Sequence, residues 1–225
     1  HEALMTHPKF KKNFGNVPVE EISVSTRIFT KKATERILRA AFEHAKKYGY
    51  KSVTVCEKPN VIRETSGMMY KMAQEIQSVD FPEIELWNTN IDAQMMWLTK
   101  NPENYGVIVA GNMFGDIISD LGAMIQGGMG VAAGGNINPE GVSMFEPIGG
   151  SAPKYAGQNV INPISAILAG KLMLETLGQP EAAHMIEKAV QKVLKEDLKG
   201  TGAGQMGFST SEVGDLIAEF ITSSK

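Results

Sequence analysis

The chain has 225 residues, of which 43% are hydrophobic and 21% charged, and its formal net charge is -3. These ordinary values exclude disordered and low-complexity classes and suit one large domain or two small ones. The balance of 22 basic against 25 acidic residues leaves no basic footprint for nucleic acid. A single cysteine, Cys56, excludes a disulfide framework. No apolar run suggests a membrane span or a signal peptide, so we expect a cytoplasmic protein.

The first half of the chain predicts alternating strands and helices. Residues 1–21 mix charges with proline and glycine and should be irregular, whereas residues 22–29 alternate apolar and polar side chains, which predicts a strand. Further strands are expected over 52–56, 84–87 and 106–110, and helices over about 32–49, 63–78, 93–99 and 116–125. Alternation at this spacing predicts an α/β fold with a central sheet flanked by helices.

The last third of the chain predicts helices almost alone, over about 163–177, 181–195 and 210–221. Helices with apolar faces need a surface to cover, and this part of the sequence offers no sheet of its own. We therefore expect strands from elsewhere to complete it.

A pair of aspartates follows the apolar strand predicted over 106–110. Asp116 and Asp120 lie four residues apart at the expected start of a helix, so both carboxylates project from one face. The carboxyl ends of such strands are where open α/β sheets bind ligands. Mg²⁺ or Mn²⁺ would relieve the repulsion between the carboxylates. The alternative is an N-cap plus a first-turn aspartate that the helix dipole stabilises.

Two more charged residues follow predicted strands. Lys58 lies just past residues 52–56, where desolvation could make it a general base, although solvated loop lysines are the common case. Asp92 lies past residues 84–87 and could be only the N-cap of the next helix. Because Lys58, Asp92 and Asp116 all follow strands of one sheet, we expect them at corresponding ends of it.

Glycines crowd the stretch between residues 106 and 157, which includes a loop over 146–157. Gly149 and Gly150 permit close approach of the backbone to a ligand. Lys154 and Tyr155 could hold a phosphate and stack an aromatic group. The loop lacks the GxGxxG dinucleotide fingerprint, and the alternative is simply a long turn.

Four motifs, in this order, resemble the isocitrate/3-isopropylmalate dehydrogenase family of metal-dependent β-decarboxylating dehydrogenases. They are EKPNVI (57–62), NID (90–92), NMFGDIISD (112–120) and GGSAPKYAGQNVINP (149–163). The resemblance runs from about Ile22 to about Leu194 and implies the fold of that family. It also implies oxidative decarboxylation of an isocitrate-like 2-hydroxy di- or tricarboxylic acid with Mg²⁺ or Mn²⁺ and NAD or NADP. Residues 127–136 are more similar to the isocitrate and homoisocitrate branches.

The resemblance implies a role for each matching residue. Asp92, Asp116 and Asp120 match the metal-site aspartates, and Lys58 matches the lysine that helps to deprotonate the substrate hydroxyl. Lys58 and Asp92 are the implied catalytic residues, normally lent across a dimer interface, so we expect a homodimer or higher oligomer with a shared active site. The residues that match the cofactor site are Gly149, Gly150, Ser151, Ala152, Lys154, Tyr155 and Asn162.

Four positions within the matched stretch bear on the chemistry. Lys154 and Tyr155 resemble the pair that reads the 2′-phosphate of NADP in bacterial isocitrate dehydrogenases, which favours NADP over NAD. Gly149 stands where the family usually has a histidine packing on adenine. Phe29 stands where the isopropylmalate branch has its proton-donating tyrosine, so the resemblance names no general acid.

The resemblance also leaves out an amino-terminal third that holds the substrate-binding arginines, and the chain begins with His1 rather than methionine. We therefore expect residues 1–127 to form the small, dimer-forming domain with the metal-site carboxylates. Residues 128–225 would form the carboxyl-terminal part of an incomplete large, cofactor-binding domain. A chain without those arginines suggests an alternative function, that of a non-catalytic or regulatory subunit that dimerises and binds nucleotide without turnover.

Overall fold

The computed structural model describes residues 2–223, so His1 lies outside the described residues. The chain divides into two compact units, which we call unit 1 and unit 2. Unit 1 comprises His1–Asn90 and Gly106–Val109, and unit 2 comprises Ile91–Tyr105 and Ala110–Lys225. The chain therefore passes from one unit to the other three times. Within residues 2–223, no helix has the length and apolar character needed to cross a membrane.

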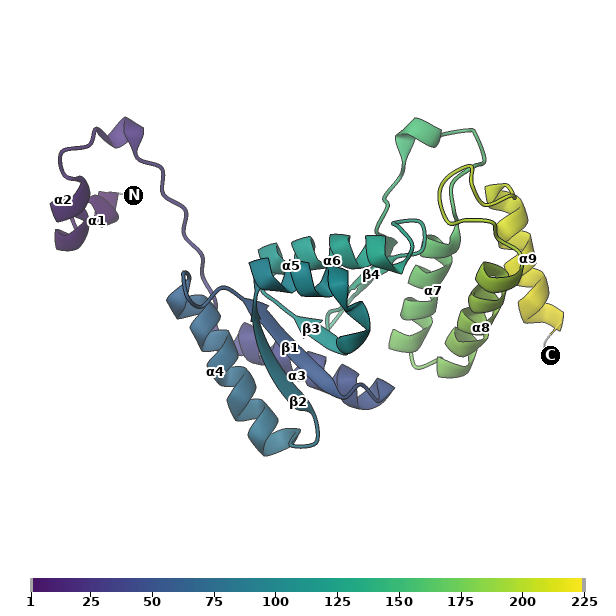
Figure 1. Cartoon of the computed structure of the whole chain (residues 1–225), viewed down its shortest axis with the longest axis horizontal. Coiled ribbons are helices and arrows are strands. Elements are labelled where there is room, and N and C mark those ends of the chain that lie inside the picture. Colours follow the sequence, from purple (N-terminus) through teal and green to yellow (C-terminus); the bar gives the residue numbers. More distant parts are fainter. Residues whose placement is uncertain (1, 224–225) are drawn as a thin grey trace. The chain divides into compact units, whose positions relative to one another are not determined.

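Unit 1 contains a parallel sheet with the strand order β2-β1-β3 (Figure 1). The central strand β1 (Ser52–Glu57) is buried along its whole length, between β2 (Glu85–Asn90) and β3 (Val107–Val109). Two long helices, α3 (Lys31–Tyr48) and α4 (Arg63–Asp80), pack on the sheet and on each other. The core between them includes Leu38, Phe42, Val53, Val55, Met69 and Phe81. The α/β class predicted from the alternation is confirmed for this unit.

Helix α3 shows how local sequence sets these elements. The Thr30 side chain accepts a hydrogen bond from the Ala33 N–H at 3.2 Å and so caps the helix N-terminus. Gly49, with φ of 73°, ends the helix in the left-handed conformation that other residues adopt at a cost. Between these caps, apolar residues recur on one face, and Leu38, Phe42 and Ala45 are fully buried.

Unit 2 begins with α5 (Ile91–Lys100), which packs against α6 (Asn112–Gln126), and the chain between them contains the 3-10 helix Pro102–Asn104. After α6, two short strands form an antiparallel pair, β4 (Ala133–Asn136) with β5 (Met144–Pro147).

The remaining helices of unit 2 pack one on the next, starting from that pair. Helix α7 (Ile164–Thr176) lies on β4 and β5 and on α8 (Pro180–Glu196), which in turn packs on α9 (Thr210–Ser223). Their shared core includes Val131, Ile164, Val193, Met206 and Val213. The three helices expected in the last third of the chain are confirmed.

Several predicted elements are wrong. Residues 22–30 contain no strand, because the described residues offer this segment no partner strand despite its alternating pattern. Residues expected to be irregular instead form two short helices, Glu2–Met5 (α1) and Pro8–Phe14 (α2), and the 3-10 helix Val19–Glu21. Proline at the first position of α2 and the contact between Phe10 and Phe14 favour that helix.

Candidate functional site

The predicted metal-site aspartates all lie on the packed helix pair α5 and α6. Asp116 and Asp120 are exposed and one turn apart on α6, while Asp92 lies in the first turn of α5. The side-chain amide of Asn112 donates a hydrogen bond to Asp116 Oδ2 at 3.2 Å. Since α6 begins at Asn112, neither carboxylate on it is an N-cap or first-turn residue, and that alternative is wrong.

These carboxylates are hard oxygen donors of the kind that Mg²⁺ and Mn²⁺ prefer, so the residue types fit a divalent ion. In the described part of one copy, however, no three His, Cys, Asp or Glu side chains lie close enough together to hold a metal. The structure therefore places Asp116 and Asp120 side by side, but it does not bring Asp92 to them within a single chain.

Lys58 lies in unit 1, directly after β1, and is half-buried. Its carbonyl accepts hydrogen bonds from the N–H groups of Val61 and Ile62 at 3.1 and 2.8 Å, which closes the turn between β1 and α4. Its own N–H donates to Ser66 Oγ at 3.4 Å. The lysine predicted to follow a strand thus lies on a hydrogen-bonded turn at the carboxyl end of the central strand.

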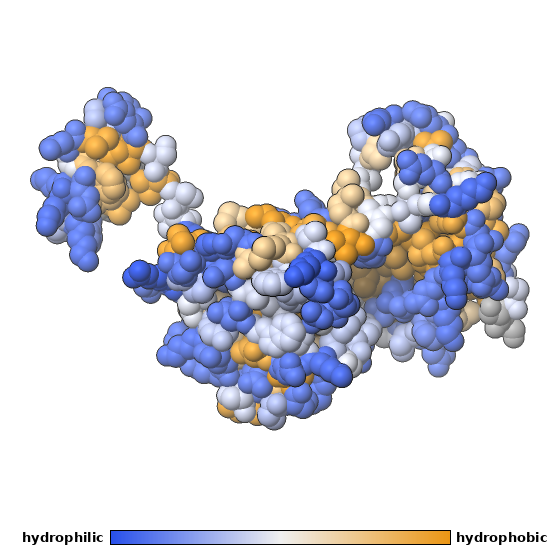
Figure 2. Space-filling view, viewed as in Figure 1, coloured by the Kyte–Doolittle hydropathy of each residue, from blue (hydrophilic) through white to orange (hydrophobic). Residues whose placement is uncertain are grey.

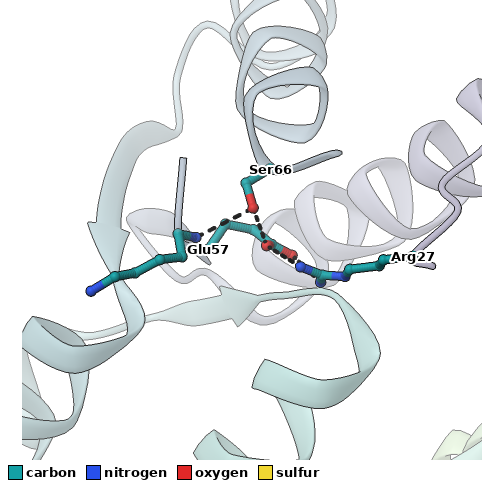
Figure 3. Close-up of polar contacts among 4 residues, drawn as sticks. Arg27, Glu57 and Ser66 are labelled. Atoms are coloured by element: carbon teal, nitrogen blue, oxygen red, sulfur yellow. Dashed lines mark hydrogen bonds and ion pairs between the residues drawn. The ribbon is translucent and has the colours of Figure 1, made fainter. Parts of the chain in front are cut away.

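A buried charge beside Lys58 was missed by the sequence reasoning. Glu57, the last residue of β1, is completely buried, and Arg27 donates to both oxygens of its carboxylate at 3.3 and 3.4 Å. Ser66 Oγ donates to the same carboxylate at 2.7 Å, from the first turns of α4 (Figure 3). The signal that could have found this cluster was an acidic residue at the end of an otherwise apolar strand, since such a group needs partners when buried.

The predicted cofactor residues gather around one pocket in unit 2, with a volume of about 550 Å³. Its size is typical of small-molecule sites. The predicted residues that line it are Gly149, Gly150, Ala152, Tyr155 and Asn162, whereas Ser151 and Lys154 are not among its lining residues. Most other lining groups are apolar or glycine, including Met124, Met129, Ile161 and Ala166. The pocket is therefore suited to a flat apolar group with a few polar contacts.

Asn162 holds two walls of this pocket together. Its Oδ1 accepts from the Ile164 N–H at 3.0 Å at the start of α7, and its Nδ2 donates to the Thr201 carbonyl at 3.1 Å. A Cβ atom at Gly130 would come within 2.9 Å of Asn162 Cβ, so only glycine fits there. The amide of Asn162 retains one N–H and one lone pair for a ligand.

The loop that carries the remaining predicted residues is strained where it meets the pocket. Ala152 has φ of 43° and ψ of 57° and precedes the 3-10 helix Pro153–Tyr155. A left-handed conformation at a non-glycine residue costs about 1–3 kcal/mol and is typical of ligand-binding loops. Lys154 is exposed, with its Nζ 5.0 Å from the centre of the Tyr155 ring. The pair therefore lies at the pocket rim, with the cation outside and the ring at the wall.

Comparison with known proteins gives the family. The family model described as isocitrate/isopropylmalate dehydrogenase matches residues 6–217. The 3-isopropylmalate dehydrogenase of Thermobifida fusca is 40% identical over 201 residues, which cover 88% of this chain and 55% of the relative. That of Archaeoglobus fulgidus is 39% identical over 201 residues, covering 89% and 61%.

A solved structure agrees with these relatives. The isocitrate dehydrogenase of Methylococcus capsulatus is 34% identical, with a TM-score of 0.80 over 91% of this chain and 61% of that one. The chain thus spans between half and two thirds of the length of these three proteins. The match of the family model over residues 6–217 and the likeness to these relatives show that the chain belongs to the isocitrate/isopropylmalate dehydrogenase family.

Proposed function

We propose that this chain takes part in the oxidative decarboxylation of a 2-hydroxy di- or tricarboxylic acid with a divalent metal and NAD or NADP. The observation that carries the proposal is the course of α6, on which Asp116 and Asp120 precede Met124, a residue of the 550 Å³ pocket. One helix therefore joins a pair of hard oxygen ligands to a pocket that suits a nucleotide. Family membership supports the reaction class.

The substrate that we propose is isocitrate-like. Residues 127–136 favour the isocitrate and homoisocitrate branches, and the solved structure is named an isocitrate dehydrogenase. The two relatives are named for 3-isopropylmalate, which is also a 2-hydroxy dicarboxylic acid, so it belongs in every substrate assay.

In the proposed mechanism Asp116 and Asp120 hold Mg²⁺ or Mn²⁺, together with Asp92 from a second copy of the chain. When bound, the metal and the nicotinamide supply Lewis-acid polarisation of the 2-hydroxyl oxygen and an acceptor for the hydride from C2. Lys58 Nζ accepts the proton of the 2-hydroxyl, directly or through water. Lys58 and Asp92 act in the site of the other copy.

The pocket in unit 2 is proposed as the nucleotide site, with the adenine between Met129 and the wall that contains Ala152 and Asn162. Gly149 offers no aromatic ring at its own position, and an added Cβ there would meet Met129 only at an ordinary contact distance of 3.6 Å. Gly149→His should therefore tighten NAD(P) binding by about tenfold, as base–aromatic stacking is worth about 1–3 kcal/mol. Isothermal titration with the nucleotide measures this, and unchanged affinity would count against adenine in this pocket.

The shared site requires an oligomer, and α5 and α6 present a surface for one. Apolar side chains are exposed on both helices (Figure 2). They are Met96 and Trp97 on α5, and Met113, Ile117, Met124 and Ile125 on α6. Contiguous exposed apolar side chains mark interaction surfaces. We propose that a second copy covers this face, which we call the α5/α6 face.

One experiment tests the proposal. The purified chain is given Mn²⁺, NAD or NADP, and isocitrate, homoisocitrate or 3-isopropylmalate, and NAD(P)H absorbance is followed. Asp116→Asn should abolish turnover and weaken Mn²⁺ binding by at least about tenfold, whereas Asp215→Asn on α9 should change neither. Silence with every substrate would overturn the enzyme function for this chain.

A second candidate function follows from the absence of a three-ligand metal cluster in the described residues of one copy. In that case the chain is a regulatory subunit that dimerises and binds nucleotide without turnover. Nucleotide binding and dimerisation without NAD(P)H formation would favour it.

Two further points are proposed with either function. They are the division into domains 1–127 and 128–225 and the cytoplasmic location.

A further inference from the structure

Glu57 carries a full carboxylate inside unit 1, immediately before Lys58 in the chain. A charge that loses all contact with water must be compensated by partners, or the buried site is strongly destabilised. Arg27 supplies the opposite charge through two contacts of 3.3 and 3.4 Å, and its side chain is 24% exposed. The partner cation therefore keeps some contact with solvent while the carboxylate has none.

Ser66 is the second partner of the Glu57 carboxyl group and links it to Lys58. A hydroxyl has one hydrogen to donate and lone pairs to accept. Ser66 Oγ lies 2.7 Å from Glu57 Oε2 and donates its hydrogen to that oxygen. Hydrogen bonds to carboxylates are short and strong. The lone pairs of Ser66 Oγ are then available to the N–H of Lys58, which lies 3.4 Å away. The Glu57 carboxyl group thus orients the Ser66 hydroxyl, which accepts from the Lys58 N–H (Figure 3).

The same carboxylate fixes a segment that has no secondary structure. Residues 22–30 run without a partner strand, and Arg27 is the residue of this segment that reaches Glu57. The guanidinium also lies 4.5 Å from the centre of the Phe29 ring, which packs against the core of unit 1. One buried group therefore ties together the segment before α3, the end of β1 and the start of α4.

We propose that Glu57 and Ser66 are positioning residues for Lys58, with Arg27 holding the Glu57 carboxyl group in place through its two contacts. This inference rests on the proposed function, in which Lys58 Nζ takes the substrate proton. The backbone of Lys58 is held from one side by Ser66 and from the other by the turn through Val61 and Ile62. Its side chain therefore leaves the end of β1 from a fixed point.

The test compares two neighbouring hydroxyls on α4. Ser66→Ala removes the bridge, whereas Thr65→Val removes the hydroxyl of Thr65, whose Oγ1 is buried without a hydrogen-bond partner among the described residues. We expect Ser66→Ala to lower kcat by up to about 100-fold with KM within about twofold, since misplacement of a reacting group affects the chemical step. Thr65→Val should leave both constants unchanged. Urea midpoints of the two variants show that each remains folded.

A measurement on the chain without substrate separates the two proposals. Turnover by the unsubstituted chain, and its loss in Lys58→Met, test the proposed function by themselves. The NMR signal of the Lys58 ε-CH₂ group and the exchange rate of the Lys58 amide test the positioning. Both should change in Ser66→Ala and stay constant in Thr65→Val. If Ser66→Ala leaves the Lys58 signals and amide exchange as they are, the inference is overturned, whether or not the chain turns over substrate.

Discussion

At the scale of single residues, the buried Glu57 is expected to contribute to stability as well as to the position of Lys58. Glu57→Gln removes the charge that faces Arg27 and leaves the guanidinium with a poorer acceptor. Arg27 is 24% exposed, so water can still solvate its guanidinium after the substitution. The substitution therefore costs the free energy of one buried hydrogen-bonded pair, and not that of an isolated buried charge. We expect the free energy of unfolding to fall by about 1–3 kcal/mol, measured by urea denaturation.

The matched control is an ion pair that water surrounds. Lys192 and Glu196 lie 3.9 Å apart, with side chains 43% and 57% exposed. Glu196→Gln should change stability by no more than about 0.5 kcal/mol. Equal effects of the two substitutions would mean that the burial of Glu57 does not matter.

The proposed preference for NADP can be tested at one residue. Lys154 presents a cation at the rim of the pocket, where a 2′-phosphate would gain a charge-assisted contact. Lys154→Asp should therefore lower the NADP/NAD ratio of kcat/KM by at least about tenfold, because an aspartate repels the phosphate and accepts from ribose hydroxyls. Gln158→Ala is the control, since the Gln158 side chain donates to the Lys154 carbonyl and not to the Lys154 side chain. An unchanged ratio in Lys154→Asp would remove Lys154 from the cofactor site.

At this scale the sequence predicts the position of residues that belong to a regular pattern. Asp116 and Asp120 share a helix face because four residues make about one turn, and Lys58 follows a strand because apolar runs mark strands. An acidic residue at the end of a strand could have marked Glu57, but its partner Arg27 could not be predicted, because it is 30 residues away in an irregular segment.

At the scale of elements, the N-cap of α3 should measurably stabilise unit 1. Thr30→Ala removes the acceptor for the Ala33 N–H and should lower the free energy of unfolding by about 1 kcal/mol. Thr30→Ser keeps a hydroxyl in the same place and should recover most of the loss. If both variants are equally destabilised, the side chain of Thr30 matters for a reason other than capping.

Helix α9 should respond to pH through its first turn. Ser209 donates to Glu212 Oε2 from its N–H and its Oγ, both at 2.7 Å, and these bonds hold the pKa of Glu212 below its ordinary value of 4.5. A carboxyl whose pKa is lower in the folded state stabilises the fold above pH 4.5 and loses that effect as the pH falls through the folded-state pKa.

The prediction is a difference between two proteins. The stability advantage of the unsubstituted chain over Glu212→Gln should be complete at neutral pH and should shrink as the pH falls below 4.5. Thermal unfolding of both proteins across pH 3–7 measures it. A constant gap over this range would show that ionisation of Glu212 does not contribute.

Element boundaries were predicted less well than element types. The helix expected from residue 116 begins earlier, at Asn112. Its start was predicted wrongly because the residue before it, Gly111, has no capping side chain that would mark it in the sequence. Strands β4 and β5 were missed, because both are only four residues long and β4 contains two glycines; in the structure α7 packs on both. The alternation of residues 22–29 predicted a strand that needs a neighbour to exist.

At the scale of the whole molecule, the α5/α6 face predicts the oligomeric state. Ile117 is 46% exposed near the middle of α6. Ile117→Asp should therefore lower the stability of a single copy only slightly, while it places a charge in the proposed interface between two copies. We expect a dimer for the unsubstituted chain and a monomer for the variant in sedimentation equilibrium.

The control substitutes an apolar residue of similar type elsewhere. Val79, on α4, is 77% exposed, and Val79→Asp should leave the dimer intact. A monomeric unsubstituted chain, or an Ile117→Asp variant that still dimerises, would show that the α5/α6 face is not the interface.

Strand β3 gives the molecule a constraint on how it can be made. The sheet of unit 1 receives this strand only after the chain has left for unit 2 and returned at Gly106. A ribosome that has synthesised the chain as far as β2 has therefore exposed a central strand, β1, with one edge still open. Open edges recruit other strands. Nascent chains stalled between β2 and β3 should be the species that most needs a chaperone, and gene fragments that stop before residue 107 should yield aggregated protein.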